Sequence, residues 1–258
     1  MPRFLLCHGW AHDGRSLDAL VAALRERFPA SEMRVQELGF AGEPVDALAE
    51  TAGRDDGEWI GIGHSWGFAQ LLTPAAPRWK ALVSINGFLR FCRAPGRRTG
   101  TPARALDAML ARLAVDPEGC LGDFRARCAT VGDVKDGTMS GESATIAVGG
   151  RSDVEIAAYA QDVPPLPGSA RLARLTTALT ALRDSDFAPP VGTPLLALAA
   201  TGDLIVPPDH ARAQFDPAQG GCATELLMLA GGHLLPGTHP AACADAIARF
   251  VSTLPATA

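Results

Sequence analysis

The most informative segment of the sequence is Gly63-His64-Ser65-Trp66-Gly67, which places one serine between two glycines. It follows the apolar run 59–62 and precedes a segment of helical character, so the serine would lie on a sharp strand-to-helix turn. A side chain at either glycine would collide with the neighbouring strand or helix. The pattern predicts a nucleophilic hydroxyl at Ser65, with the N–H of Trp66 facing the oxyanion; a chance match in a glycine-rich chain is the alternative.

A nucleophilic serine needs a general base, and the histidines supply the candidates. His233 ends the segment Ala230-Gly231-Gly232-His233, in which a glycine-rich loop after a predicted strand can place an imidazole over the serine. A solvent-exposed loop histidine is the alternative. For the other histidines we expect a surface or capping role at His210 and His239, a side chain pointing away into the turn at His64, and no role at His12.

The carboxylate that orients the base should follow an earlier strand, and Thr201-Gly202-Asp203 does so at the end of the run 194–200. Asp203 would hold the tautomer of His233 and stabilise its imidazolium without taking the proton. A turn aspartate is the alternative, since Asp is common in turns. Asp209 and Asp186 are weaker candidates for the same role.

His8-Gly9-Trp10 follows the first predicted strand, as an oxyanion loop should. The Trp10 amide would be a second donor beside that of Trp66, although Trp10 could equally be only a wall of the acyl pocket. One such donor contributes about 3–4 kcal/mol to stabilising the transition state in proteases. We expect Trp10, Trp66 and Phe88 to contact the substrate.

Apolar runs alternate with segments of helical period, as a parallel sheet covered by helices requires. The expected strands cover 4–7, 33–38, 59–62, 81–85, 194–200 and 225–229, and the expected helices 16–28, 45–52, 103–113, 121–128 and 240–251. Between residues 88 and 187 no buried strand is evident. The sequence therefore predicts an α/β core, 1–87 and 188–258, with a helical cap inserted at 88–187, in which 132–150 and 163–168 form loops.

Composition narrows the classes further. The chain has 258 residues, 47% of them hydrophobic, which suits one globular domain, and a net charge of −5, which gives no overall attraction to nucleic acid. Its six cysteines form no C-x-x-C pair, so we expect neither a metal nor another cofactor. With no evident secretory leader or long apolar run, we expect a soluble cytoplasmic protein that does not bind a membrane.

With these motifs in place, the chain resembles the α/β-hydrolase superfamily over nearly its whole length. Within it, the chain is similar to the small BioH-type esterases that hydrolyse pimeloyl-acyl carrier protein methyl ester in biotin synthesis. The narrower likeness rests on Trp10, on Asn86-Gly87-Phe88-Leu89-Arg90-Phe91 before the cap, and on Asp184-Ser185-Asp186-Phe187 after it. It implies a serine carboxylesterase that uses Ser65, Asp203 and His233. Trp66 departs from the family, in which leucine or methionine is commoner.

The predicted cap is rich in arginine, in contrast to the acidic chain as a whole. Acyl carrier protein is small and acidic, so a basic surface would steer it towards the serine. Arginines that only decorate a solvated helix are the alternative. The candidate carrier-binding cluster is Arg90, Arg93, Arg125 and Arg127. Other functions left open are a broad small-molecule carboxylesterase, a C–C hydrolase or lyase, and a non-catalytic binding module; the oligomeric state is open.

Overall fold

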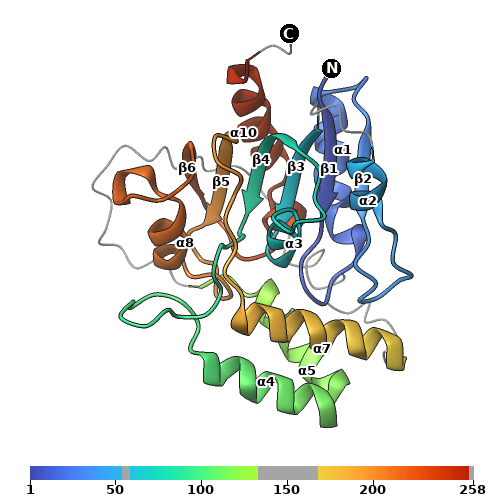
Figure 1. The fold of residues 1–258 in the computed structure, drawn as a ribbon, viewed down its shortest axis with the longest axis vertical. Helices are drawn as coiled ribbons and strands as arrows, with labels where there is room; N and C mark the ends of the chain where they lie inside the picture. The colour runs from blue at the N-terminus through green and yellow to red at the C-terminus, as the bar shows by residue number, and fades with distance from the viewer. Residues whose placement is uncertain (54–58, 133–167, 256–258) are drawn as a thin grey trace.

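The computed structural model describes residues 1–53, 59–132 and 168–255. Its centre is a six-stranded, wholly parallel sheet in the order β2-β1-β3-β4-β5-β6. Figure 1 shows the strands side by side across the centre among the helices, with the cap helices across one end of the strands. The strands are β1 (Arg3–Cys7), β2 (Met33–Gln36), β3 (Trp59–His64), β4 (Trp79–Ile85), β5 (Leu195–Ala200) and β6 (Glu225–Leu229).

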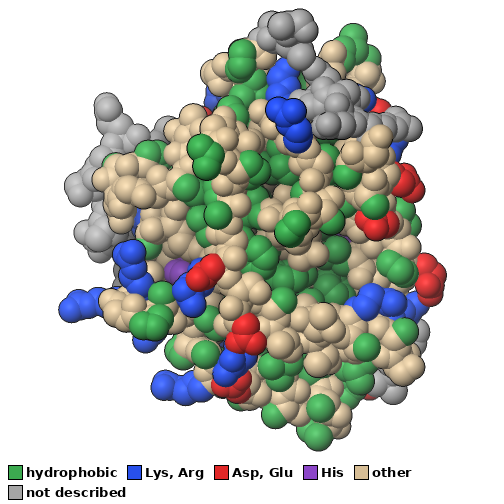
Figure 2. All heavy atoms as spheres, in the orientation of Figure 1, with side chains coloured by type: hydrophobic (Ala, Val, Ile, Leu, Met, Phe, Trp, Pro, Cys, Tyr) green, Lys and Arg blue, Asp and Glu red, His purple; other side chains and the backbone are tan. Residues whose placement is uncertain are grey.

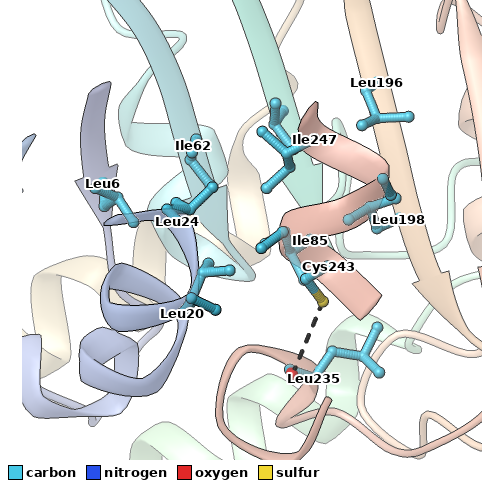
Figure 3. Close-up of a cluster of buried hydrophobic side chains, with 14 of the residues drawn as sticks. Leu6, Leu20, Leu24, Ile62, Ile85, Leu196, Leu198, Leu235, Cys243 and Ile247 are labelled. Carbon is cyan, nitrogen blue, oxygen red and sulfur yellow. Dashed lines mark hydrogen bonds between the residues drawn. The ribbon is translucent and has the colours of Figure 1, made fainter. Parts of the chain in front are cut away.

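Alternate residues of each strand face opposite sides of the sheet, because side chains in a strand point up and down in turn. On one side, Leu6, Ile62 and Ile85 pack against α1 (Asp18–Arg27) and α10 (Pro240–Thr253). Figure 3 shows this cluster, in which the Cys243 thiol also donates to the Leu235 carbonyl at 3.9 Å. Apart from this thiol, the cluster consists of apolar side chains.

On the other side, Leu5, Leu82 and Ala197 pack against the second helical layer. That layer consists of α2 (Ala47–Ala52), α3 (Trp66–Gln70) and α8 (Pro208–Phe215). Helices on both faces explain why the central strands read as continuous apolar runs rather than alternating ones. The short elements η1 (Gly14–Leu17), η2 (Pro217–Gln219) and α9 (Leu235–Thr238) complete the connections.

Between β4 and β5 the chain leaves the sheet and forms α4 (Ala103–Val115), α5 (Pro117–Ala129) and α7 (Ser169–Asp184). These three cap helices lie beneath the sheet in Figure 1, where the strands end. The described part of 88–187 contains isolated bridges but no strand, as expected. The loops predicted at 132–150 and 163–168 lie almost wholly outside the described residues.

The predicted α/β class with an inserted helical region is confirmed. Among the cap helices in the described residues, α7 is the one that we did not predict, and its Leu175, Leu179 and Leu182 pack into the cap's apolar cluster. About half of the boundaries differ from the predicted ranges, nearly all by one or two residues and in both directions, because the ends of helices and strands depend on backbone hydrogen bonds as well as on apolar positions. No helix in the described ranges is long and apolar enough to cross a membrane.

Candidate active site

Ser65 occupies the turn between β3 and α3 at the end of the sheet that faces the cap. Its backbone is strained, with φ 53° and ψ −123°, and its N–H donates to Ile85 O at 3.0 Å. A Cβ at Gly63 would overlap the backbone of Phe68, and one at Gly67 the backbone of Cys7. The two glycines therefore allow α3 to pack closely enough on the sheet to turn Ser65 towards the cap.

Asp203 and His233 form a buried hydrogen-bonded pair. Asp203 Oδ2 lies 2.7 Å from His233 Nδ1, and the side chains are 0% and 1% exposed. Asp203 Oδ1 accepts N–H bonds from Ile205 at 2.7 Å and Val206 at 2.9 Å. Because the carboxylate only accepts, Nδ1 of His233 carries the proton and Nε2 is left as the basic nitrogen. This is the arrangement that a general base requires.

The loop carrying His233 is hydrogen-bonded to His64, which directly precedes Ser65. The main-chain carbonyl of His233 accepts from His64 Nε2 at 2.9 Å, and the two imidazole centroids lie 5.0 Å apart. No hydrogen bond joins the Ser65 hydroxyl to the His233 ring in the described structure. In ligand-free sites such catalytic bonds are often long and shorten when substrate binds.

Two predictions about other histidines were wrong. His64 does not point away from the site: it is 1% exposed and bonded to the His233 loop. Burial, with a contribution from nearby His233, lowers its pKa to about 3, so the ring is neutral at ordinary pH. His210 is not a surface residue, because its ring is buried and Nε2 donates to Arg90 O at 2.6 Å.

The loop after β1 carries Trp10, and contacts from the cap hold it in place. Trp10 Nε1 donates to Leu175 O in α7 at 3.0 Å, and its ring packs edge-on against Phe124 in α5 at 4.8 Å. Arg125 Nε and Nη2 donate to Ala11 O at 3.2 and 3.0 Å. Contacts from α5 and α7 thus hold the loop at Trp10 in place beside Ser65.

His8 and Glu37 hold the same loop from the sheet side, and sequence reasoning missed Glu37. His8 is buried, and its Nε2 lies 2.9 Å from Glu37 Oε1. Glu37 Oε2 accepts from the Gly14 amide at 2.9 Å. Burial alone would raise the pKa of Glu37, but the hydrogen bonds from His8, Gly14 and Gly39 outweigh it and lower the pKa. A carboxylate late in a strand is not a distinctive signal.

An apolar chamber of about 30 Å³ lies over Ser65. Trp10 and Phe88 contribute to its wall together with cap side chains, among them Leu106, Met109, Phe124 and Leu182. A second cavity of about 350 Å³ opens between α4 and α5. Five apolar side chains line both cavities and separate them: Phe91, Leu106, Met109, Phe124 and Ile205. Trp66 does not line this chamber; its ring packs edge-on against Phe187, with the ring centroids 5.9 Å apart.

The four arginines of the predicted carrier cluster do not form one surface. Arg125 is a correction: its side chain is 7% exposed and holds Ala11, so it cannot meet a partner. Arg90 pairs with Asp186 at 2.7 Å, and Arg127 donates to Leu204 O at 3.1 Å from an exposed position. Arg93 is exposed in the strap 88–102 that leads into α4.

Solved structures similar to this chain share one architecture at low sequence identity. A bromoperoxidase from Bacillus anthracis matches with TM-score 0.67 and 16% identity over 97% of this chain and 92% of the other. An esterase from Exiguobacterium antarcticum matches with TM-score 0.67 and 14% identity over 98% and 92%. BioG from Haemophilus influenzae matches with TM-score 0.57 and 18% identity over 91% and 89%.

No protein-family description matches the sequence, and neither does any curated protein. The structural likeness, together with the parallel sheet and the inserted helices, shows that the chain has the α/β-hydrolase fold. Such a likeness speaks for the fold alone, because one fold hosts many activities. The function must be argued from the site.

Proposed function

We propose that this protein is a serine hydrolase that cleaves a carboxylic ester through an acyl-enzyme. The observation that carries the proposal is the strained Ser65 turn beneath an apolar chamber, with the buried Asp203–His233 pair on the loops that follow β5 and β6. Strained backbone of this kind is found where a structure holds a reactive group in place. Esterases also occur among the structurally similar proteins, which agrees with the proposal.

The reaction follows from the positions of these groups. His233 Nε2 takes the hydroxyl proton of Ser65, and the oxygen attacks the ester carbonyl. The backbone N–H groups of Trp10 and Trp66 stabilise the oxyanion; Trp66 is the first residue of α3, where an amide has no partner within the helix. The alcohol leaves with the proton from His233. Water then attacks the acyl-enzyme by the same route and releases the acid.

The specific substrate that we propose is the methyl ester of pimeloyl-acyl carrier protein. The support is the sequence resemblance together with exposed basic residues next to the chamber. Basic side chains gather at the lower left of Figure 2, over the strap that precedes α4. Exposed arginines of this region are Arg93, Arg97, Arg98 and Arg104. They would attract an acidic carrier and direct its acyl arm towards Ser65.

The alternative is a broad carboxylesterase acting on free esters. One observation favours it: Arg125 is buried and Arg90 is paired, so the basic surface is smaller than the sequence suggested. A C–C hydrolase or lyase is less favoured, since the chamber over Ser65 is lined almost entirely by apolar groups.

Labelling with a fluorophosphonate tests the enzyme class. We expect one adduct, located at Ser65 by peptide mass spectrometry, and no adduct in Ser65→Ala. That variant should also lose turnover by a factor on the order of a million. Full esterase activity in Ser65→Ala, or labelling at another residue, would refute the assignment.

A charge-reversal pair tests the carrier substrate. In Arg93→Glu/Arg97→Glu we expect kcat/KM for a carrier-linked methyl ester to fall about tenfold, while hydrolysis of a short aryl ester stays unchanged. The matched control, Arg25→Glu/Arg249→Glu, makes the same change at exposed positions on α1 and α10, on the layer of the sheet away from the strap. Equal effects of the two pairs, or no effect of either, would favour the broad esterase.

A further inference from the structure

The main-chain carbonyl of His233 is bonded by two side chains from other elements. His64 Nε2, at the end of β3, donates to it at 2.9 Å, and Asn86 Nδ2, just after β4, donates at 2.9 Å. Both donors are buried, at 1% and 2% exposure. A carbonyl oxygen has two lone pairs, so these two bonds use its full accepting capacity.

Asn86 connects this carbonyl to the turn that carries Asp203. Its Oδ1 accepts from Ala200 N at 2.8 Å, at the end of β5, and its Nδ2 also donates to Gly232 O at 3.1 Å. Its backbone has φ 48°, a conformation that asparagine tolerates better than most residues. One amide group therefore fixes the acid turn and the base loop relative to each other.

His64 connects the same carbonyl to the nucleophile turn. It directly precedes Ser65, and because a carbonyl can only accept, its Nε2 carries the proton. A Cβ at Gly9 would come within 3.3 Å of His64 Nδ1 and 3.2 Å of Ser65 Cβ, so the glycine leaves room for the ring. The strand-to-helix turn that positions Ser65 therefore also positions the imidazole of His64.

We propose that His64 and Asn86 are positioning residues, which place the imidazole of His233 between Ser65 and Asp203 by fixing its main-chain carbonyl. The loop that carries His233, here called the base loop, includes Gly231, with φ 127°, and Gly232. Because glycine is conformationally permissive, contacts from other elements must hold this loop in one conformation. Displacement of a reacting group by about 1 Å can cost roughly a hundredfold in rate. The predicted loss of rate rests on the proposed function. The predicted effect on the hydrogen bond between Asp203 and His233 rests on the geometry alone.

Four variants isolate the two bonds. His64→Leu removes the donor at similar size, whereas His64→Gln can keep an N–H near the place of Nε2. Asn86→Asp keeps shape and turn preference but replaces the donor by an acceptor. Ser84→Ala is the matched control, because Ser84 is a buried polar residue of β4, 1% exposed, that does not contact the base loop through any hydrogen bond of the described structure.

Steady-state kinetics on an aryl ester give the first readout. We expect kcat to fall about a hundredfold in His64→Leu and Asn86→Asp with KM within threefold of the parent, since the chamber is untouched. His64→Gln should recover kcat to within about fivefold of the parent, and Ser84→Ala should match it. A lower melting temperature without a change in kcat would indicate a purely structural role and overturn the proposal.

Proton NMR gives a readout that needs no activity. The Nδ1 proton shared by His233 and Asp203 should give a resonance far downfield of the amide region. We expect it to shift or disappear in His64→Leu and Asn86→Asp and to persist in His64→Gln and Ser84→Ala. If the parent hydrolyses no ester, the proposed function fails while this test still decides the positioning role. If His64→Leu does not fold, Asn86→Asp decides, and an unchanged resonance there overturns the proposal.

Discussion

The two sides of the chamber are built by opposite means. On the sheet side, Asp203, His233, His64 and Asn86 form a continuous set of buried hydrogen bonds that joins the ends of β3, β4 and β5 to the base loop. On the cap side, the wall consists of apolar side chains from three helices. A satisfied network of buried hydrogen bonds specifies the positions of individual atoms, whereas apolar packing specifies mainly volume and shape.

This difference separates two properties of an enzyme. Under the proposed function, chemistry would require exact placement of a few atoms, and on the sheet side hydrogen bonds connect the elements that carry those atoms. Under the proposed function, selection of the acyl group would depend on the size of the cavity, and Met109 and Phe124 are among the apolar side chains that separate the two spaces. Changes on the sheet side should therefore act mainly on kcat, and changes on the cap side mainly on substrate preference.

Replacing the buried acid should have the largest effect. In Asp203→Asn the amide would donate to Nδ1 of His233, so the proton would move to Nε2 and the base would be lost. We expect kcat to fall roughly 10⁴-fold, as in the serine protease precedent, with KM nearly unchanged. Asp209→Asn is the matched control, because Asp209 is an exposed acid on α8 that pairs with Arg212. Equal losses in the two variants would contradict the pairing seen here.

Breaking the tie between cap and oxyanion loop should have an intermediate effect. Arg125→Met keeps most of the apolar stem but removes the guanidinium that donates to Ala11 O. We expect the free energy of unfolding to fall by about 1–3 kcal/mol, because a buried carbonyl loses its donors. We also expect kcat to fall about tenfold, because Trp10 precedes the released carbonyl.

Urea unfolding and steady-state kinetics measure the two effects of Arg125→Met. Arg127→Met is the control, since Arg127 also donates to a carbonyl, that of Leu204, but from the surface. If Arg125→Met lost stability while kcat remained at the parent value, the bond from Arg125 to Ala11 O would stabilise the fold without placing the Trp10 amide for the reaction.

The fold could be predicted because its signals are local. Buried parallel strands are continuous apolar runs, and Glu225–Leu229 was located to the residue. Helix α7 was missed although Leu172, Leu175, Leu179 and Leu182 recur at helical spacing within Ser169–Asp184, and these leucines pack into the cap's apolar cluster. The signal for this helix was therefore present in the sequence.

Within the candidate site, sequence reasoning identified the side chains that come after strands but not those that hold the backbone between them. Asp203 and His233 follow strands in recognisable glycine turns, and the structure brings them together. Their catalytic roles stay a prediction. Asn86 and Glu37 act through contacts between residues far apart in the chain, which no spacing encodes. Arg125 was misjudged because charge in sequence does not reveal burial.

Shortening the partition between the two cavities should shift acyl preference. Met109 lines both spaces, so Met109→Ala would join the chamber over Ser65 to the larger cavity. We expect the ratio of kcat/KM for an octanoyl over an acetyl aryl ester to rise about tenfold, which corresponds to burial of roughly two more methylenes in the space that Met109 vacates, at about 0.8 kcal/mol each. Leu110→Ala, on the same helix but in neither cavity lining, should leave the ratio unchanged. A similar rise in both variants would mean that general loosening of α4 is responsible.

The smallest effect concerns the pH dependence of folding stability. The pKa of His64 is lowered from 6.5 to about 3 by burial, so between these values the unfolded chain binds a proton that the folded protein does not. The unfolded state gains the proton, so the free energy of unfolding must fall as pH decreases through this window. His64 alone should account for a loss of about 1.5 kcal/mol between pH 6.5 and pH 5. Burial also lowers the pKa of His12.

Urea unfolding of the parent and of His64→Gln at the two pH values isolates this share, because other titrating groups are common to both proteins. We expect the variant to lose less stability on acidification than the parent, by about 1.5 kcal/mol. Parallel pH profiles would show that His64 takes up its proton equally in the folded and unfolded states. The imidazole would then not be buried in the sheet side of the site. That result would contradict the fixed polar network by which the sheet side differs from the apolar cap side.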